Sequence, residues 1–97
     1  PEVLDHHPEV REASLLIIEC TFLDDRKPVS VARAGCHIHI DELIERLPEV
    51  KSDRILLMHF SQLTPPRQVR EICERRLRPL LGDRLSLFLP EGERWWL

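Results

Sequence analysis

The chain lacks any hydrophobic run long enough to cross a membrane. Its longest uninterrupted aliphatic stretches are residues 15–18 and 55–58, whereas a membrane-spanning helix needs about 20 apolar residues. No basic segment followed by an apolar stretch opens the sequence, so a secretory signal is not expected. The first residue is Pro1 rather than Met, and we expect the sequence to begin inside a longer protein.

Cysteine is scarce, and its spacing carries no motif. The chain has 3 cysteines, Cys20, Cys36 and Cys73, which is an odd number without C-x-x-C spacing. This argues against a disulfide framework and against a structural zinc knuckle. We therefore expect free thiols in a reducing compartment, with the cytoplasm as the default location.

The overall composition is that of one small globular domain. In 97 residues, 42% are hydrophobic and 32% are charged, which excludes a disordered chain and allows a modest core. Charge is unevenly spread: residues 1–53 carry 6 Lys+Arg against 12 Asp+Glu, and residues 54–97 carry 8 against 5. The arginines of the second part suggest either a phosphate-facing patch or a solvated helix face with i,i+4 Arg–Glu pairs; they include Arg67, Arg70, Arg75, Arg76, Arg78 and Arg84.

Three apolar segments are predicted to form buried strands. Residues 15–18 and 54–59 are short apolar runs bounded by charged residues, and residues 85–89 alternate leucines with Ser86 and Phe88 before Pro90. Runs of this length and pattern are typical of strands in an α/β sheet.

Helical periodicity lies between these strands. Residues 41–47 have apolar side chains on one face and are followed by Pro48. Thr64 is predicted to cap a second helix that keeps an i, i+3, i+4 rhythm up to residue 81 and ends at Gly82. Residues 1–13 are expected to form a connection and a short helix, and residues 29–34 a short helix or an irregular loop. The order β-α-β-α-β predicts an α/β layer with right-handed crossovers.

Such a sheet would be covered on one side only. Three strands with helices on one face leave the other face open, and Trp95 and Trp96 add large apolar side chains that need cover. We therefore expect residues 1–97 to be part of a larger fold.

Polar residues that can do chemistry follow two of the predicted strands. His59 lies at the carboxyl end of one strand, where α/β proteins place their sites. Glu19 ends another, and a buried carboxylate there needs a partner such as histidine. His37 and His39 form an H-x-H pair that can chelate zinc on an extended segment, whereas the two rings diverge if His39 starts a helix.

Three tetrapeptides bear a family resemblance when they are taken in order: Ile18-Glu19-Cys20-Thr21, Cys36-His37-Ile38-His39 and Met58-His59-Phe60-Ser61. Together they resemble the His-Glu-Ala-Thr, Gly-His-Ser-Thr and Thr-His-Phe-Ser motifs in the C-terminal portion of metallo-β-lactamase-fold hydrolases, most closely ribonuclease Z. The resemblance covers about residues 14–62. It implies that residues 1–97 are a single partial domain, the β-α-β-α-β portion of a four-layer αββα sandwich.

The resemblance also implies roles for individual residues. His59 matches a metal-ligand histidine, and Glu19 with His37 matches a pair that assists proton transfer to the leaving group. His39 stands where the family has threonine and inherits no role from it; we expect His39 and Ser61 to support the site from outside. The implied cofactor is Zn²⁺, two ions in the intact protein, with Mn²⁺ or Fe²⁺ as alternatives. The implied activity is hydrolysis of an RNA phosphodiester in tRNA processing.

Departures from the family motifs leave alternatives open. Ile18 replaces the motif histidine, Cys20 replaces its alanine, and Leu63-Thr64 stand where the family has Arg-Tyr. The family's other metal ligands lie N-terminal to the matched region, so we expect this chain alone to bind zinc weakly and to be inactive. Its partner would be the missing N-terminal half, on the same chain or another one. The alternatives are a hydrolase of another ester or thioester, and a non-catalytic half-domain that docks onto another chain or a second copy.

Overall fold

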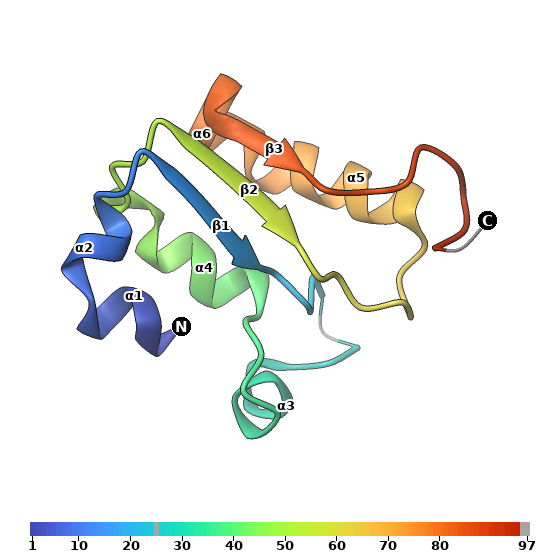
Figure 1. Ribbon diagram of the computed structural model, residues 1–97. Helices are drawn as coiled ribbons and strands as arrows, with labels where there is room; N and C mark the ends of the chain where they lie inside the picture. Colours follow the sequence, from blue (N-terminus) through green and yellow to red (C-terminus); the bar gives the residue numbers. More distant parts are fainter. Residues whose placement is uncertain (25, 96–97) are drawn as a thin grey trace.

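A computed structural model describes residues 1–24 and 26–95 and has one parallel sheet (Figure 1). The sheet has the order β1-β2-β3, with β1 (Leu15–Glu19), β2 (Arg54–Met58) and β3 (Leu85–Leu87). Both strand pairs are parallel, and Ile17 lies beside Leu56 in the register. The predicted α/β class with β-α-β-α-β order is confirmed.

Helices precede and connect the strands. The chain opens with α1 (Glu2–His6) and α2 (Pro8–Arg11). Two connections follow, the first made by α3 (Val29–Ala34), α4 (Ile40–Arg46) and η1 (Leu47–Glu49), the second by α5 (Pro66–Arg76), α6 (Arg78–Leu81) and η2 (Gly82–Arg84). Figure 1 shows α4, α5 and α6 behind the sheet, and within residues 1–24 and 26–95 no helix lies in front of it. The sheet therefore has one covered face and one open face.

The core lies between the sheet and these helices. Alternate strand residues point into it, and each of them is less than a tenth exposed: Leu16, Ile18, Ile55, Leu57 and Leu85. Leu43 from α4 and Val69 from α5 are buried against them. Burial of this apolar surface is the main stabilising contribution available to so small a chain.

The open face carries the other half of each strand. Leu15 and Ile17 are each 52% exposed, Met58 is 37% exposed, and Phe88, which directly follows β3, is 67% exposed. Because successive side chains of a strand point to opposite faces, an uninterrupted apolar run places hydrophobic residues on both. The exposure of these strand residues agrees with the expectation that one face of the sheet is uncovered.

The prediction of one continuous helix from Thr64 to Gly82 is wrong. This segment forms two helices, since α5 ends at Arg76 and α6 starts at Arg78. Pro79 has no N–H to donate, and its ring clashes with the carbonyl four residues earlier, so one helix cannot run through it. The break leaves Leu80 54% exposed, although its spacing predicts packing against the sheet. Gly82 ends α6 with φ 55°, in the region that favours glycine.

Element ends also differ from the predictions. Thr64 is not the N-cap of α5, because Pro65 holds that position without a side-chain cap. The Thr64 hydroxyl instead accepts a hydrogen bond from the Arg26 guanidinium at 3.2 Å. The second strand stops at Met58 rather than His59, and the third at Leu87 rather than residue 89. Strand ends are set by ladder partners, which the apolar pattern does not contain.

Two further observations concern the helices and the cysteines. Across residues 1–24 and 26–95, none of the helices has the length and apolar character needed to pass through a bilayer. All three cysteines are free thiols, with Cys20 and Cys73 buried and Cys36 exposed. Burial raises the pKa of the Cys73 thiol to about 12, so this residue is held as an unreactive thiol.

Candidate active site

The strand register brings two of the predicted site residues together. Glu19 is the last residue of β1 and pairs with Met58, the last residue of β2, so His59 follows directly beside it. His37 arrives from the loop after α3. That loop forms an isolated parallel bridge with the segment after β1, in which Phe22 donates to the Ile38 carbonyl at 3.3 Å and accepts from the Ile40 N–H at 2.8 Å.

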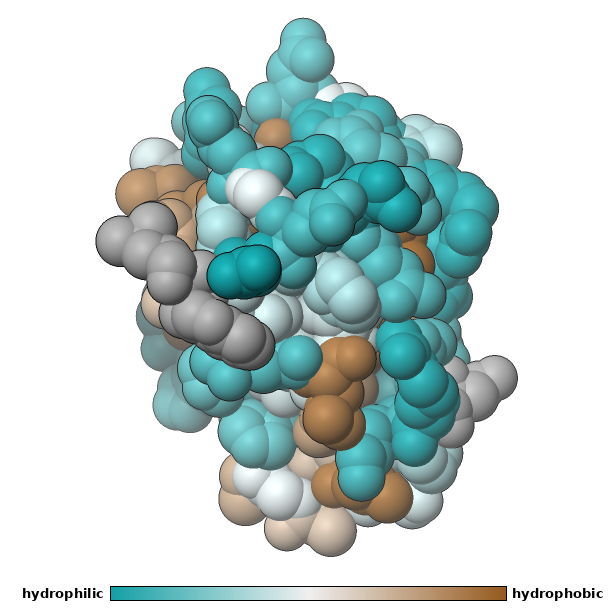
Figure 2. Space-filling view, turned by 90° about the vertical axis from the view of Figure 1, so that its right-hand side faces the viewer, coloured by the Kyte–Doolittle hydropathy of each residue, from teal (hydrophilic) through white to brown (hydrophobic). Residues whose placement is uncertain are grey.

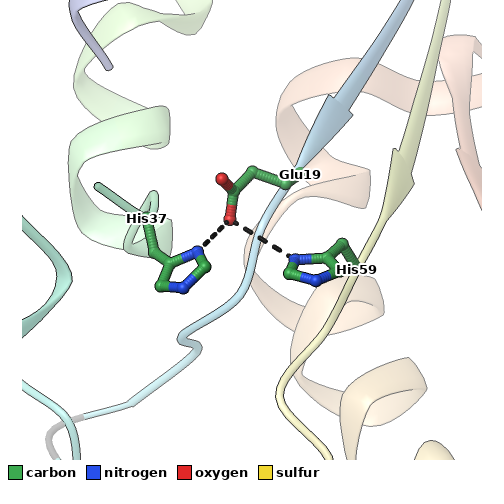
Figure 3. Close-up of side chains that lie close together, drawn as sticks. All are labelled: Glu19, His37 and His59. Atoms are coloured by element: carbon green, nitrogen blue, oxygen red, sulfur yellow. Dashed lines mark hydrogen bonds and ion pairs between the residues drawn. The ribbon is translucent and has the colours of Figure 1, made fainter. Parts of the chain in front are cut away.

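Glu19 lies between the two imidazoles (Figure 3). Its Oε2 atom is 3.1 Å from His37 Nδ1 and 3.8 Å from His59 Nδ1. The two rings have centroids 5.7 Å apart. One ligand atom from each of the three residues lies within 4.8 Å of the others, which is close enough for a metal-binding group.

The backbone takes unusual conformations beside both histidines. His59 and Cys36 each have φ 59°, a left-handed value that few non-glycine residues adopt. At His59 this ends the strand, and the Ser61 N–H then bonds to the Thr21 carbonyl at 2.8 Å. At Gly35, an added Cβ would lie 3.2 Å from His37 Cδ2. The glycine therefore leaves room for the His37 ring.

The Glu19 carboxylate is stabilised in its charged form. Partial burial opposes ionisation, but hydrogen bonds from Thr21 and His37 and from the Ile38 backbone outweigh it, and the pKa of Glu19 is lowered. The side chains are 27% exposed at Glu19, 35% at His37 and 63% at His59. The site is thus open to solvent, and the side of the molecule at which the strands end is mainly hydrophilic (Figure 2).

Thr21 is a site residue that the sequence reasoning missed. Its side chain is buried and donates a hydrogen bond to Glu19 Oε2. The same hydroxyl oxygen is 3.2 Å from His59 Nδ1 and 3.4 Å from His37 Nδ1. The only signal in the sequence is its place in the first tetrapeptide, because a threonine two residues after a strand is otherwise commonplace.

His39 diverges from His37, as expected if it starts a helix. It is the N-cap of α4, where Nδ1 accepts from the Asp41 N–H at 3.1 Å and Nε2 donates to the Asp24 carbonyl at 2.9 Å. Ser61 accepts from the Leu63 N–H at 3.2 Å. Both side chains hold the loops that flank the site. Their contribution to its chemistry stays a prediction.

Most of the arginines in the second part of the sequence bind carboxylates or backbone carbonyls of this same chain. Arg78 pairs with Glu74 at 2.7 Å, Arg76 with Asp41 at 2.8 Å, and Arg67 with Glu93 at 3.3 Å. Arg70 and Arg84 donate to backbone carbonyls. These contacts favour the solvated, paired helix face over a phosphate-binding patch.

Trp95 packs against the chain itself. Its Nε1 donates to the Thr64 carbonyl at 2.9 Å, and its ring stacks on Phe60 with centroids 6.4 Å apart. Trp96 lies outside the described residues. Trp95 is therefore already partly covered, which weakens the prediction that it forms a docking surface.

The fold and the cluster define a segment of an α/β protein with a His–Glu–His group at the strand ends. No family model matches the chain. It is similar to tRNase Z TRZ1 of Arabidopsis thaliana, with 35% identity over 76 residues that make up 78% of this chain and 27% of the relative. It is also similar to the chloroplastic tRNase Z TRZ2 of the same plant, with 39% identity over 59 residues, 61% of this chain and 17% of the relative.

These relatives confirm the predicted resemblance to ribonuclease Z. The chain spans about a quarter or less of the length of the curated relatives that it matches.

Proposed function

We propose that the chain forms the C-terminal part of a zinc-dependent endoribonuclease of the ribonuclease Z type. The single observation that carries this proposal is the Glu19 carboxylate between His37 and His59 at adjoining strand ends. The similarity to two tRNase Z proteins supports RNA as the substrate class.

His37 is the proposed proton donor to the leaving group. Its Nδ1–H donates to Glu19 Oε2 at 3.1 Å, which orients the ring and leaves Nε2 to carry the transferred proton. In hydrolysis, the water oxygen bonds to phosphorus as the bond to the 3′ oxygen breaks, and that oxygen takes the proton from His37 Nε2. The attacking water releases one proton to solvent, from which His37 regains its own, so the protons balance over the cycle. The lowered pKa of Glu19 keeps its carboxylate charged, so it remains the hydrogen-bond acceptor that orients the His37 ring.

His59 is the proposed zinc ligand of this chain. Its Nδ1 faces Thr21 at 3.2 Å, and the ring is largely exposed, so Nε2 is free to bind. Bound zinc would polarise the phosphodiester of the substrate and lower the pKa of a water molecule. Imidazole suits zinc, but Glu19 Oε2 is already shared by Thr21 and His37. A catalytic zinc takes about three protein ligands, so the others would come from outside this chain.

The rest of the fold would lie against the open face. By alternation along β1, Glu19 shares a face with Leu15 and Ile17, which are uncovered. Whatever covers that face would therefore reach the cluster and could add the missing ligands. Residues 1–97 would then be one partial domain, inactive and weakly zinc-binding by itself.

Leaving-group chemistry gives the sharpest test. The intact protein is assayed on precursor tRNA and on bis(p-nitrophenyl) phosphate, whose leaving group departs as an anion without a proton. The variant His37→Gln should lose about 10²–10⁴-fold on tRNA but little on the activated ester, with zinc content unchanged. The variant His59→Gln should lose zinc, measured by atomic emission, and activity on both substrates.

A matched control is His7→Gln. His7 lies between α1 and α2, its side chain is exposed, and it bonds to Glu9, far from the cluster in the sequence. Its rates should equal those of the unaltered protein. Equal tRNA cleavage by His37→Gln would sink the proton-donor role. Turnover of a thioester in place of both phosphodiesters would replace the substrate class.

A further inference from the structure

We infer that Thr21 is a positioning residue that sets the tautomers of His37 and His59. Thr21 is 6% exposed. Its hydroxyl oxygen contacts Glu19 Oε2 and the Nδ1 atoms of His37 and His59, and it lies 3.0 Å from the His59 carbonyl. The geometry stands by itself, and its catalytic meaning rests on the proposed function.

A proton count leads to the assignment. A threonine hydroxyl has one proton to donate and two lone pairs that accept. A charged carboxylate is a stronger acceptor than a neutral carbonyl, and Glu19 keeps its charge, so the hydroxyl proton goes to Glu19 Oε2. The His59 carbonyl, 3.0 Å away, shares this proton as the weaker acceptor. The two imidazole nitrogens then face the lone pairs of the Thr21 oxygen.

If an Nδ1 atom carried no proton, its lone pair would point at a lone pair of Thr21 Oγ1 from 3.2 or 3.4 Å, and the two would repel each other. His59 Nδ1, at 3.2 Å from Thr21 Oγ1, is therefore protonated. His37 Nδ1 is protonated as well, because it also lies 3.1 Å from Glu19 Oε2. Both rings thus carry their free lone pair on Nε2, the atom proposed to bind metal in His59 and to carry the transferred proton in His37.

The two histidines do not depend on Thr21 equally. His37 keeps the Glu19 carboxylate as an acceptor if the hydroxyl is removed. His59 Nδ1 is 3.8 Å from Glu19, too far for a hydrogen bond, so Thr21 is what fixes its tautomer. Loss of the hydroxyl should therefore act on His59 and spare His37.

Side-chain ¹H–¹⁵N long-range correlation spectra of the metal-free, histidine-labelled chain test this inference. They are recorded at pH ~8, where an ordinary imidazole is neutral. We expect Nδ1–H tautomers at His37 and His59. In Thr21→Val, which keeps the shape and removes the hydroxyl, His59 should shift to a tautomer mixture while His37 stays unchanged. The variant Thr21→Ser should restore the original His59 signals.

His39 is an internal reference in the same spectra. It holds the opposite tautomer, with Nε2–H donated to the Asp24 carbonyl and Nδ1 accepting from Asp41, and should keep it in every folded variant. A protonated Nε2 at His59 in the unaltered chain would overturn the inference even if Thr21→Val fails to fold. An unchanged His59 in a folded Thr21→Val chain would overturn it too.

Zinc affinity of the intact protein gives a second measurement. Groups that orient a metal ligand are worth about 10–100-fold in affinity, so Thr21→Val should weaken zinc binding by that factor and Thr21→Ser should not. These outcomes are separable from the proposed function. The expected tautomers without RNA cleavage would refute the nuclease and leave the inference standing, whereas RNA cleavage with the wrong tautomers would do the reverse.

Discussion

The two faces of the sheet carry similar aliphatic residues along β1 but differ in cover. On β1, Leu16 and Ile18 are each 7% exposed, whereas Leu15 and Ile17 are each 52% exposed. Strands with hydrophobic residues on both faces are typical of parallel sheets that are buried on both sides. The aliphatic residues of β1 on the open face therefore resemble those of a buried face, although Glu19, Arg54 and Ser86 also lie on the open side. Along β1 the difference between the faces lies in what covers them.

A matched pair of isoleucines tests this comparison with the largest expected effect. Ile55 is 0% exposed on the covered face, and Ile17 is 52% exposed on the open face. The variant Ile55→Ala should lower the free energy of unfolding by about 2–5 kcal/mol because it leaves a cavity. The variant Ile17→Ala should lower it by less than about 1 kcal/mol. Urea denaturation of the chain measures both, and equal losses would mean that the open face is covered in solution.

Substitutions at the N-termini of α4 and α5 should lower the free energy of unfolding by less than Ile55→Ala does. His39 caps α4 through the Asp41 N–H, whereas Thr64 gives α5 no cap. We expect His39→Ala to cost about 1–2 kcal/mol of unfolding free energy and Thr64→Val less than that. Thermal unfolding of the two variants measures the difference. A larger loss for Thr64→Val would restore its predicted role as a cap.

Charge on the open face should leave folding nearly unchanged. In the chain by itself, Ile17→Lys is expected to shift the free energy of unfolding by no more than about 0.5 kcal/mol, as at most surface positions. It should reduce binding of an apolar fluorescent dye and any association at high concentration, measured by sedimentation velocity. Leu63→Lys, at an exposed loop residue away from the strands, is the matched control. Equal dye loss in both variants would contradict an apolar docking face.

The smallest effect is the pH dependence that Glu19 contributes. Its pKa is lowered in the folded chain, so its stabilising contribution is complete above the ordinary glutamate pKa of about 4.3 and is lost as pH falls through the folded value. The stability difference between the unaltered chain and Glu19→Gln should be constant above about pH 5 and shrink in acid. Urea titrations at several pH values measure it. A difference that persists in acid would contradict the lowered pKa.

The site was predictable only in part from the sequence. Glu19 and His59 stand out because each follows an apolar run, and His37 stands out through its neighbours in the tetrapeptide. Thr21 does not, because its importance arises from four contacts to groups 2 to 38 positions away. The left-handed conformation of His59 is equally hidden, since only a small fraction of histidines adopt it and no neighbouring residue marks it.

The fold shows the same division. Apolar runs locate all three strands. The helix predicted to run to Leu47 ends one residue earlier, at Arg46, and Pro48 lies inside η1. Thr64 fits the N-cap pattern well, but Pro65 takes that position and Arg26 takes the Thr64 hydroxyl. Leu80 fits the helical rhythm, but Pro79 breaks the helix before it.

The sequence by itself determined the strands, their order along the chain and the three motifs, because hydrophobic periodicity and short motifs are local properties. The tertiary structure decided which face of the sheet is covered and which polar groups meet at its edge. Those outcomes depend on strand register and on crossover helices packing on one side, and they join residues that are far apart in the chain. A hydroxyl becomes central to a site only when folding brings its partners around it.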